Sequence, residues 1–277
     1  MLNALTIDVE DYFQVSNFEN AVKMEDWDKY ESRVVKNTRE ILSILSQNDS
    51  KATFFILGWI AERFPEIVME IDAQGHEIAS HGYSHKLIYR MSREEFKDDL
   101  IRSLEILERI TKKKVLGYRA ASCSVTEDSL WALDVLKENG IKYDSSVFPI
   151  HHDRYGIPDA DRFIHRWNNN GLVELPFSTV NILGQNIPVA GGGYFRLYPY
   201  WFTKWAIEKI NREGYPAIVY IHPWELDYKQ PRIKANLISG CRHYINLRKT
   251  EDRLKALLSD FKFTGALEVV KSQGLIA

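Results

Sequence analysis

Two histidines in the segment HEIASHGYSHKLIYR (residues 76–90) have the types and spacing that could do chemistry. His81 and His85 lie four residues apart, so a helical turn or a tight loop could present both imidazoles to one cation. Zinc commonly takes two histidines and a carboxylate, and keeps its fourth position open for water. The HxxxH pattern is common, however, and taken alone it is more simply explained by two solvated imidazoles in a loop.

Carboxylates for such a site could come from the acidic segment DVED, which contains Asp8, Glu10 and Asp11. Adjacent acids have two uses in a metal-dependent hydrolase, because one can bind the metal while another acts as general base. Arg119 could hold an ionised carboxylate by a bidentate contact, or it could be an ordinary surface arginine. His222 is a candidate general acid, and its alternative is a buried histidine with only a structural role.

The elements expected to position these residues alternate between strands and helices. Apolar runs of strand length predict β-strands at 3–8, 51–57, 76–80, 114–119, 141–146, 172–179 and 216–222. Helical periodicity predicts helices at 32–47, 59–75, 92–111, 126–140, 198–214 and 250–261. Ser92 and Glu95 have the spacing of a capping box at the start of one of these helices. The β-α alternation predicts parallel strands with crossover helices, whose carboxyl ends share one rim. The candidate residues follow these strands and are therefore expected to converge.

Composition narrows the class of protein. The 277 residues carry a formal charge of -2, so no basic excess favours a nucleic-acid or membrane-surface partner. Cys123 and Cys241 lie far apart and form no CxxC, which fits free thiols in a reducing compartment. No window approaches the apolar length of a membrane span, and the N-terminus lacks the features of a signal peptide. We therefore expect one cytoplasmic domain, and its oligomeric state is not readable from the sequence.

Ordered motifs from residue 6 to about residue 223 resemble those of the polysaccharide deacetylases of the NodB-homology class, carbohydrate esterase family four. They are TIDVED, SHGYSH, GYRA and IHP. The chain is most similar to the subgroup found with exopolysaccharide and exosortase loci, through DVEDYF, YDSS, GGGYFRLYPY, YIHPWELD and the tail QPRI…RHYINLRKTEDRLKALLSDFKF. The resemblance implies a single α/β domain over residues 1–277, a distorted and incomplete (β/α)7-type barrel, with a subgroup-specific C-terminal segment at about 228–277.

The same resemblance implies hydrolysis of N-acetyl groups from amino sugars of a polysaccharide or exopolysaccharide precursor, with a divalent metal that is usually zinc. It implies a role for each matching residue: Asp8 as base, His81 and His85 as metal ligands, Arg119 as the tether of the base, and His222 as acid. Many relatives have two adjacent aspartates in the first motif, whereas Val9 follows Asp8 here. The third metal ligand is therefore expected to be Glu10, with Asp11 as the alternative.

Other positions carry weaker expectations. Ala121 stands where relatives commonly have a proline, which could loosen the loop that carries Arg119. Asp144, in YDSS, could tune the acid His222, or it could hold a loop. Aromatic faces stack on sugar rings, so substrate contacts are expected from Tyr194, Phe195 and Trp224, and from Arg196 toward an anionic group; the alternative is core packing, which we favour for Trp201.

Two other functions fit these residues. One is a related metal-dependent amidohydrolase that acts on peptidoglycan or on a cyclic ureide. The other is a glycan-binding protein without catalysis, although a binder would have no need for Asp8, both histidines, Arg119 and His222 together.

Overall fold

A computed structural model gives the fold and describes residues 1–152, 154–167, 169–189, 191–235 and 237–276. The strands of its central sheet are β1 (Leu2–Val9), β2 (Thr53–Ile56), β3 (Glu77–Ser80), β4 (Gly117–Tyr118), β5 (Tyr143–Asp144), β6 (His165–Arg166), β7 (Val173–Glu174), β10 (Ile218–Ile221) and β11 (Lys262–Thr264). Their order is β10-β1-β2-β3-β4-β5-β7-β6, and β11 pairs with β1 outside this path. β8 (Thr179–Ile182) and β9 (Gln185–Pro188) form a separate hairpin.

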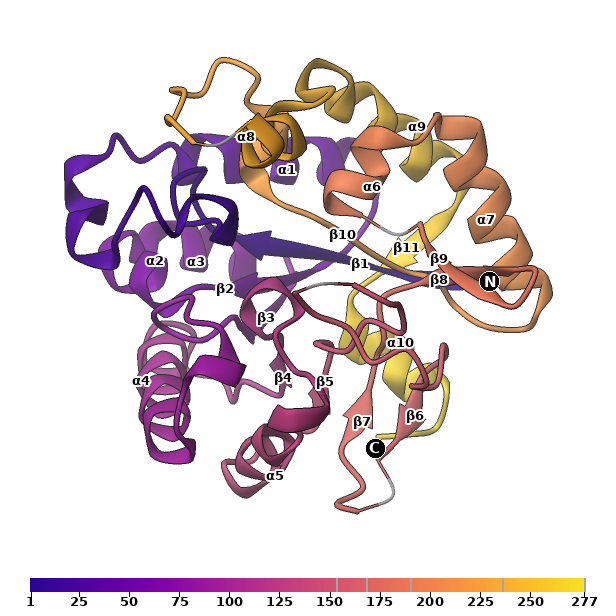
Figure 1. Cartoon of the computed structure of the whole chain (residues 1–277), viewed down its shortest axis with the longest axis horizontal. Coiled ribbons are helices and arrows are strands. Elements are labelled where there is room, and N and C mark those ends of the chain that lie inside the picture. The colour runs from indigo at the N-terminus through magenta and orange to yellow at the C-terminus, as the bar shows by residue number, and fades with distance from the viewer. Residues whose placement is uncertain (153, 168, 190, 236, 277) are drawn as a thin grey trace.

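The pairs from β10 to β7 are parallel, and β6 pairs with β7 in the antiparallel direction. Helices surround this curled sheet (Figure 1). They are α1 (Val34–Gln47), α2 (Gly58–Arg63), α3 (Pro65–Ala73), α4 (Arg93–Thr111), α5 (Trp131–Glu138), α6 (Gly192–Leu197), α7 (Tyr200–Arg212), α8 (Leu237–Tyr244), α9 (Thr250–Asp260) and α10 (Ala266–Ser272). Because β10 and β6 stand at opposite ends of the order, the sheet does not close on itself. The predicted incomplete α/β barrel is confirmed.

Local signals explain where several helices begin and end. The capping box is confirmed, since Ser92 Oγ accepts from the Glu95 N–H and a Glu95 carboxylate oxygen accepts from the Ser92 N–H. The single helix predicted at 59–75 is wrong: α2 ends at Arg63 and α3 begins at Pro65. Proline has no N–H to continue a helix and is well suited to the first helical position, so Pro65 divides the segment in two.

The alternation of side chains along β1 places the first acid inside the barrel. Leu5, Ile7 and Val9 face outward and pack in the main hydrophobic core between sheet and helices. Ala4 belongs to a second buried cluster on the inner face, together with residues of β2, β3, β5 and β7. Side chains on a strand alternate between its two faces, so Asp8 lies on the same inner face as Ala4.

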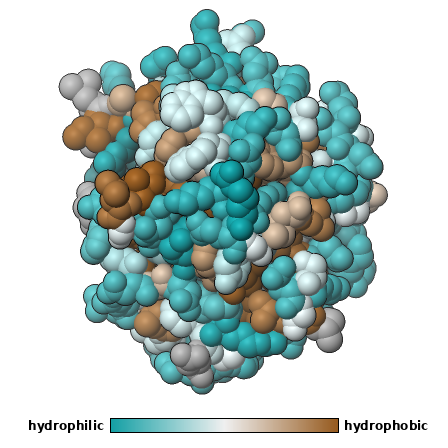
Figure 2. All heavy atoms as spheres, turned by 90° about the vertical axis from the view of Figure 1, so that its right-hand side faces the viewer, coloured by the Kyte–Doolittle hydropathy of each residue, from teal (hydrophilic) through white to brown (hydrophobic). Residues whose placement is uncertain are grey.

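Within the described ranges, no helix is both long and apolar enough to cross a bilayer. The face that carries α7 and the β8–β9 hairpin is mostly hydrophilic, with small hydrophobic patches between the polar groups (Figure 2). Trp201 of α7 is 69% exposed, so the expectation that it packs in the core is wrong. The buried face of α7 is formed instead by Thr203, Ala206, Ile207 and Ile210.

Candidate active site

Asp8 and Arg119 form a buried ion pair inside the barrel. Arg119 Nη1 donates to Asp8 Oδ1 and to Thr6 Oγ1, each at 2.7 Å. Its Nε and Nη2 donate to the carbonyl and hydroxyl oxygens of Ser145, at 3.0 and 2.7 Å, and its guanidinium lies over the Phe55 ring. The expectation that Arg119 makes a bidentate contact with the carboxylate is therefore wrong. One guanidinium nitrogen binds Asp8, while the other two bind Ser145 and fix the orientation of the guanidinium.

Glu10, His81 and His85 each bring one ligand atom to within 4.8 Å of the others. His81 Nδ1 is 2.7 Å from the carbonyl oxygen of Arg119. A carbonyl oxygen can only accept a hydrogen bond, so Nδ1 carries the hydrogen and Nε2 keeps a lone pair for a ligand. His85 Nε2 lies 2.6 Å from Glu10 Oε2, and the His85 side chain is 4% exposed. The two histidines are thus not solvated loop residues.

Glu10 Oε2 shows that this cluster fits a cation. The atom is buried and, within the described residues, accepts no hydrogen bond of good geometry, although His85 Nε2 is close to it. Burial alone would raise the pKa of Glu10, but His85, His222 and His81 lower it to about 2, so the carboxylate is ionised. A buried carboxylate oxygen without a donor is costly. One carboxylate and two imidazoles are also a usual donor set of catalytic zinc sites.

Asp11 faces away from this cluster. Its Oδ2 accepts from Ser32 Oγ at 2.6 Å and from the N–H groups of Arg33 and Val34 at 2.9 and 3.2 Å. Those groups lie where α1 begins, and the first N–H groups of a helix have no partner within the helix. Asp11 therefore accepts hydrogen bonds from the free N–H groups at the start of α1. Glu10 is the acid that the fold places beside the two histidines.

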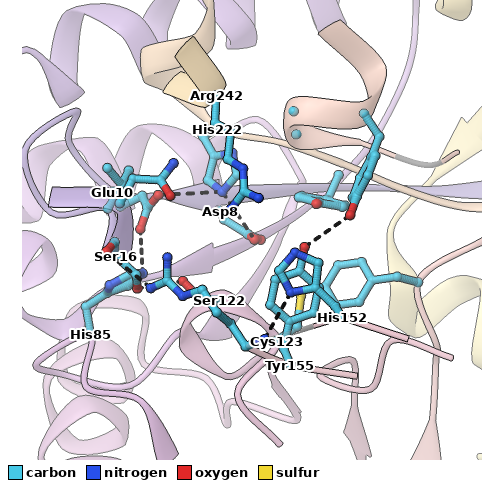
Figure 3. Close-up of a pocket in the computed structure, with 18 of the residues that line it drawn as sticks. Asp8, Glu10, Ser16, His85, Ser122, Cys123, His152, Tyr155, His222 and Arg242 are labelled. Atoms are coloured by element: carbon cyan, nitrogen blue, oxygen red, sulfur yellow. Dashed lines mark hydrogen bonds and ion pairs between the residues drawn. The ribbon is translucent and has the colours of Figure 1, made fainter. Parts of the chain in front are cut away.

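His222 follows β10 and faces both acids (Figure 3). Its Nε2 is 3.8 Å from Asp8 Oδ2 and 3.5 Å from Glu10 Oε1, while its Nδ1 is 2.6 Å from Glu225 Oε1. Burial alone would lower the pKa of His222, but the hydrogen bond with Glu225 and the charge of Glu10 raise it to about 9. At neutral pH the imidazole is thus protonated, as a general acid must be.

Glu225 is the main site residue that the sequence analysis missed. It is fully buried, and its Oε2 accepts from Arg196 Nε at 2.5 Å. Burial alone would raise the pKa of Glu225, but Arg196 and His222 lower it to about 2. Its position three residues after His222, on a short helical turn at Pro223–Leu226, was a usable signal, because one turn brings the two side chains together.

Arg196 and Phe195 do not take the substrate-binding places expected of them. Phe195 is 1% exposed and packs in the main core. Arg196 is 2% exposed, and besides Glu225 it donates to the backbone carbonyls of residues 242, 243 and 245. The guanidinium borders the pocket, but these contacts use its three nitrogens. Tyr194 and Trp224 line the pocket, and their contact with substrate stays a prediction.

The loop after Arg119 is held in an unusual conformation. Ser122 and Cys123 have φ values of +51° and +55°, a left-handed conformation that costs on the order of 1–2 kcal/mol per residue outside glycine. The hydroxyl groups of Ser122 and Ser16 form a hydrogen bond of 2.7 Å, and the Ser124 N–H donates to the Ala121 carbonyl at 3.1 Å. These hydrogen bonds hold the loop on both sides of Ser122, and the expectation of a looser loop at Ala121 stays a prediction.

Asp144 lies with Glu174 instead of with the acid His222. The two are register partners on β5 and β7, both fully buried, and Asp144 Oδ1 accepts from Ser146 Oγ at 2.6 Å. Among the described residues, Asp144 Oδ2 has no hydrogen-bond donor while both carboxyl groups are ionised. A proton shared with Glu174 provides that donor. Burial, and then the charge of Asp144, raise the pKa of Glu174 well above its ordinary value. In the described chain, no contact joins Asp144 to His222; Glu225 has that place.

This carboxyl pair predicts a pH dependence of folding stability. Between the ordinary pKa of a glutamate and the raised pKa of Glu174, the folded state binds more protons, so the free energy of unfolding falls as pH rises. In the Glu174→Gln variant the side chain cannot ionise, and its amide can donate to Asp144. From pH 5 to pH 8 the free energy of unfolding of this variant should fall less than that of wild type, by a difference on the order of 2 kcal/mol. Denaturant unfolding at both pH values measures this. Glu138→Gln, at a glutamate with a 59% exposed side chain, is the control; parallel profiles for wild type and Glu174→Gln would contradict the pairing.

One pocket of about 450 Å³ contains the converging polar groups (Figure 3). At one end lie Asp8, Glu10, His81, His85 and His222. Aromatic side chains form much of the remaining wall, namely Tyr89, Tyr155, Phe177, Tyr194, Tyr220 and Trp224. The pocket thus combines a metal-ligating cluster, a carboxylate, a protonated imidazole and flat apolar surfaces of the kind on which sugar rings stack.

Comparisons with known proteins agree with this arrangement. Residues 26–144 match the family model Polysaccharide deacetylase, and residues 145–271 match a domain of unknown function, DUF3473. The chain is 32% identical over 120 residues to a peptidoglycan-N-acetylglucosamine deacetylase of Bacillus cereus. This match covers 39% of the chain and 44% of the Bacillus cereus protein. It spans less than half the length of the first curated relatives that it matches.

Solved structures share the fold. A Mycobacterium smegmatis protein, provisionally assigned as a polysaccharide deacetylase, superposes with a TM-score of 0.63 at 20% identity and covers 99% of this chain and 91% of its own. Puue allantoinase superposes with a TM-score of 0.61 at 16% identity, covering 97% and 88%. These identities show the fold alone. Residues 26–144 thus match the polysaccharide deacetylase family, and the chain around them has the fold of these solved structures.

Proposed function

We propose that the chain is a metal-dependent hydrolase that removes N-acetyl groups from amino sugars of a polysaccharide or exopolysaccharide precursor and releases acetate. One observation carries this proposal: Asp8 and His222 meet the Glu10-His81-His85 cluster in a single pocket. Similar proteins include a peptidoglycan-N-acetylglucosamine deacetylase and a chitooligosaccharide deacetylase, which supports an N-acetylated amino sugar as substrate. The donor set supports zinc as the cation.

Glu10, His81 and His85 would hold the cation. A divalent metal in such a site supplies polarisation of the carbonyl and a lower pKa of a water molecule. Asp8 accepts the proton of the water that attacks the acetyl carbonyl, and Arg119 keeps one Asp8 oxygen occupied so that the other faces His222. His222 donates a proton to the amide nitrogen as the C–N bond breaks, because an amine leaves poorly without it. Glu225 accepts a hydrogen bond from Nδ1 of His222, on the opposite side of the imidazole from Nε2, and so fixes the orientation of the ring.

A screen of acetate release from the zinc-loaded protein tests the proposal. We expect acetate from N-acetylhexosamine oligomers, with one new amino group for each acetate. Ring opening of a cyclic ureide without acetate release would support the related amidohydrolase instead. Tight glycan binding with no metal and no product would support the alternative of a binding protein. Peptidoglycan fragments belong in the same screen, because their acetate yield relative to simple oligomers identifies the preferred polymer.

A further inference from the structure

Arg242 of α8 extends its side chain into the pocket beside His222 (Figure 3). Among the described residues, two other arginines line the pocket, and both have partners. Arg196 is held by Glu225, and Arg154 Nη2 lies 3.6 Å from Glu19 Oε1. Within the same described part of the chain, the Arg242 guanidinium has no hydrogen bond or ion pair. It is thus the pocket arginine whose charge is left for a ligand.

The backbone of Arg242 is anchored to the site. Its carbonyl oxygen accepts from Arg196 Nη2 at 3.2 Å, and the next carbonyl, of His243, accepts from Arg196 Nη1 at 2.7 Å. The His243 ring stacks on Trp224 with 4.1 Å between ring centres, and Trp224 Nε1 donates to Glu10 Oε1 at 3.2 Å. Arg242 is therefore presented from a fixed position, not from a freely moving surface helix.

Among the described lining residues, no carboxylate is left unpaired for Arg242. Asp8 is paired with Arg119, and Glu10 belongs to the cluster of metal-ligating groups. On the side of Arg242, the neighbouring wall consists of Tyr155 and Tyr194, whose hydroxyl oxygens are 3.3 Å apart. Burial raises the pKa of both phenols, and the charge of Arg242 opposes that rise, which places the guanidinium near both.

We propose that Arg242 binds an anionic group of the saccharide, a carboxylate or a phosphate, close to the sugar that loses its acetyl group. The inference rests on the proposed function and narrows its substrate to an acidic saccharide. A guanidinium matches the oxygens of either anion with two parallel hydrogen bonds. From the sequence, Arg196 was expected to contact an anionic group of the substrate. The fold buries Arg196 and directs Arg242 into the pocket, so we assign this contact to Arg242 instead.

Matched oligosaccharides test this assignment. The neutral arm is N-acetylglucosamine oligomers, the carboxylate arm alternates N-acetylglucosamine with glucuronate, and the phosphate arm carries a phosphate on the reducing end. Arg242→Gln should lower kcat/KM for an anionic arm about 10- to 100-fold more than for the neutral arm, the range expected for charge-assisted hydrogen bonds. Arg242→Lys should retain part of the preference. Arg248→Gln, the same change at an exposed arginine outside the pocket, is the matched control.

The outcomes separate this inference from the proposed function. A preference for one anionic arm that only Arg242→Gln removes supports the inference and identifies the anion. Acetate release without any anionic preference, or equal losses on all arms, overturns it and leaves the deacetylase proposal standing. If no arm releases acetate, the proposed function fails. Calorimetric binding of the anionic oligomers to wild type and Arg242→Gln then still decides the role of Arg242, since equal affinities overturn it.

Discussion

Asp8→Asn should lower kcat for acetate release by about 10²- to 10⁴-fold, the usual contribution of a general base. The amide can still accept from Arg119 through its oxygen, so the inner barrel should remain packed. Its nitrogen then takes the place of Asp8 Oδ2, the oxygen 3.8 Å from His222 Nε2, and cannot accept the proton of water. Steady-state kinetics on the best substrate of the screen measures the loss.

The metal content of the Asp8→Asn protein must be measured beside its activity. Asp8 is not among the three residues of the metal-ligating cluster, so the variant should bind the cation as wild type does. Asp11→Asn is the matched control, because Asp11 lies outside the cluster and an amide oxygen can still accept from the N–H groups of Arg33 and Val34. Undiminished kcat in a metal-loaded Asp8→Asn protein would show that Asp8 is not the base.

His222→Asn should separate substrates by their leaving groups. An amide nitrogen must be protonated as it leaves, so deacetylation of an N-acetyl sugar should slow by about 10²- to 10⁴-fold. An activated acetate ester has a leaving group that needs no proton, and its hydrolysis should slow by less than about tenfold. The ratio of the two kcat/KM values is therefore the informative quantity.

Glu225→Gln provides the companion measurement for His222. It leaves the imidazole in place but removes the charge 2.6 Å from Nδ1, so the same selective loss should appear with a smaller factor. If His222→Asn slowed the amide and the activated ester equally, His222 would act by shaping the pocket and not by donating a proton.

The convergence of the candidate residues was predictable from the sequence. The apolar runs are strong strand signals, and parallel strands bring their carboxyl ends to one rim. Asp8, His81 and His222 therefore meet in one pocket, and Arg119 lies behind them, paired with Asp8. The (β/α) architecture followed from the same alternation, and the capping box of α4 followed from local spacing.

The choice between Glu10 and Asp11 was not predictable in this way. β1 ends at Val9, so the strict alternation of a strand no longer fixes where the next two side chains point. The orientation of Asp11 depends on a contact with Ser32, 21 residues away in sequence, at the start of α1. Ser32 Oγ donates a hydrogen bond to Asp11 there, which turns Asp11 away from the histidines. Nothing in the local sequence DVED encodes that contact.

The Arg196–Glu225 pair and Arg242 were hidden for a similar reason. Arg196 reaches Glu225 across 29 residues and the carbonyl of residue 242 across 46, and neither contact has a local signature. Trp201 shows the limit of periodicity as a guide. A helical pattern reports one buried face, but it did not show that Trp201 lies outside the buried face of α7.

Acetate release from an N-acetylated oligosaccharide, measured against bound metal in the same wild-type sample, tests the central claim most directly. Chelation followed by stepwise return of zinc should abolish the activity and then restore it in proportion to occupancy, with full rate at about one zinc per chain. The chain should stay folded throughout, as circular dichroism would show. Full-rate acetate release from protein with less than about 0.1 metal per chain would contradict the assignment of Glu10, His81 and His85 as the metal site.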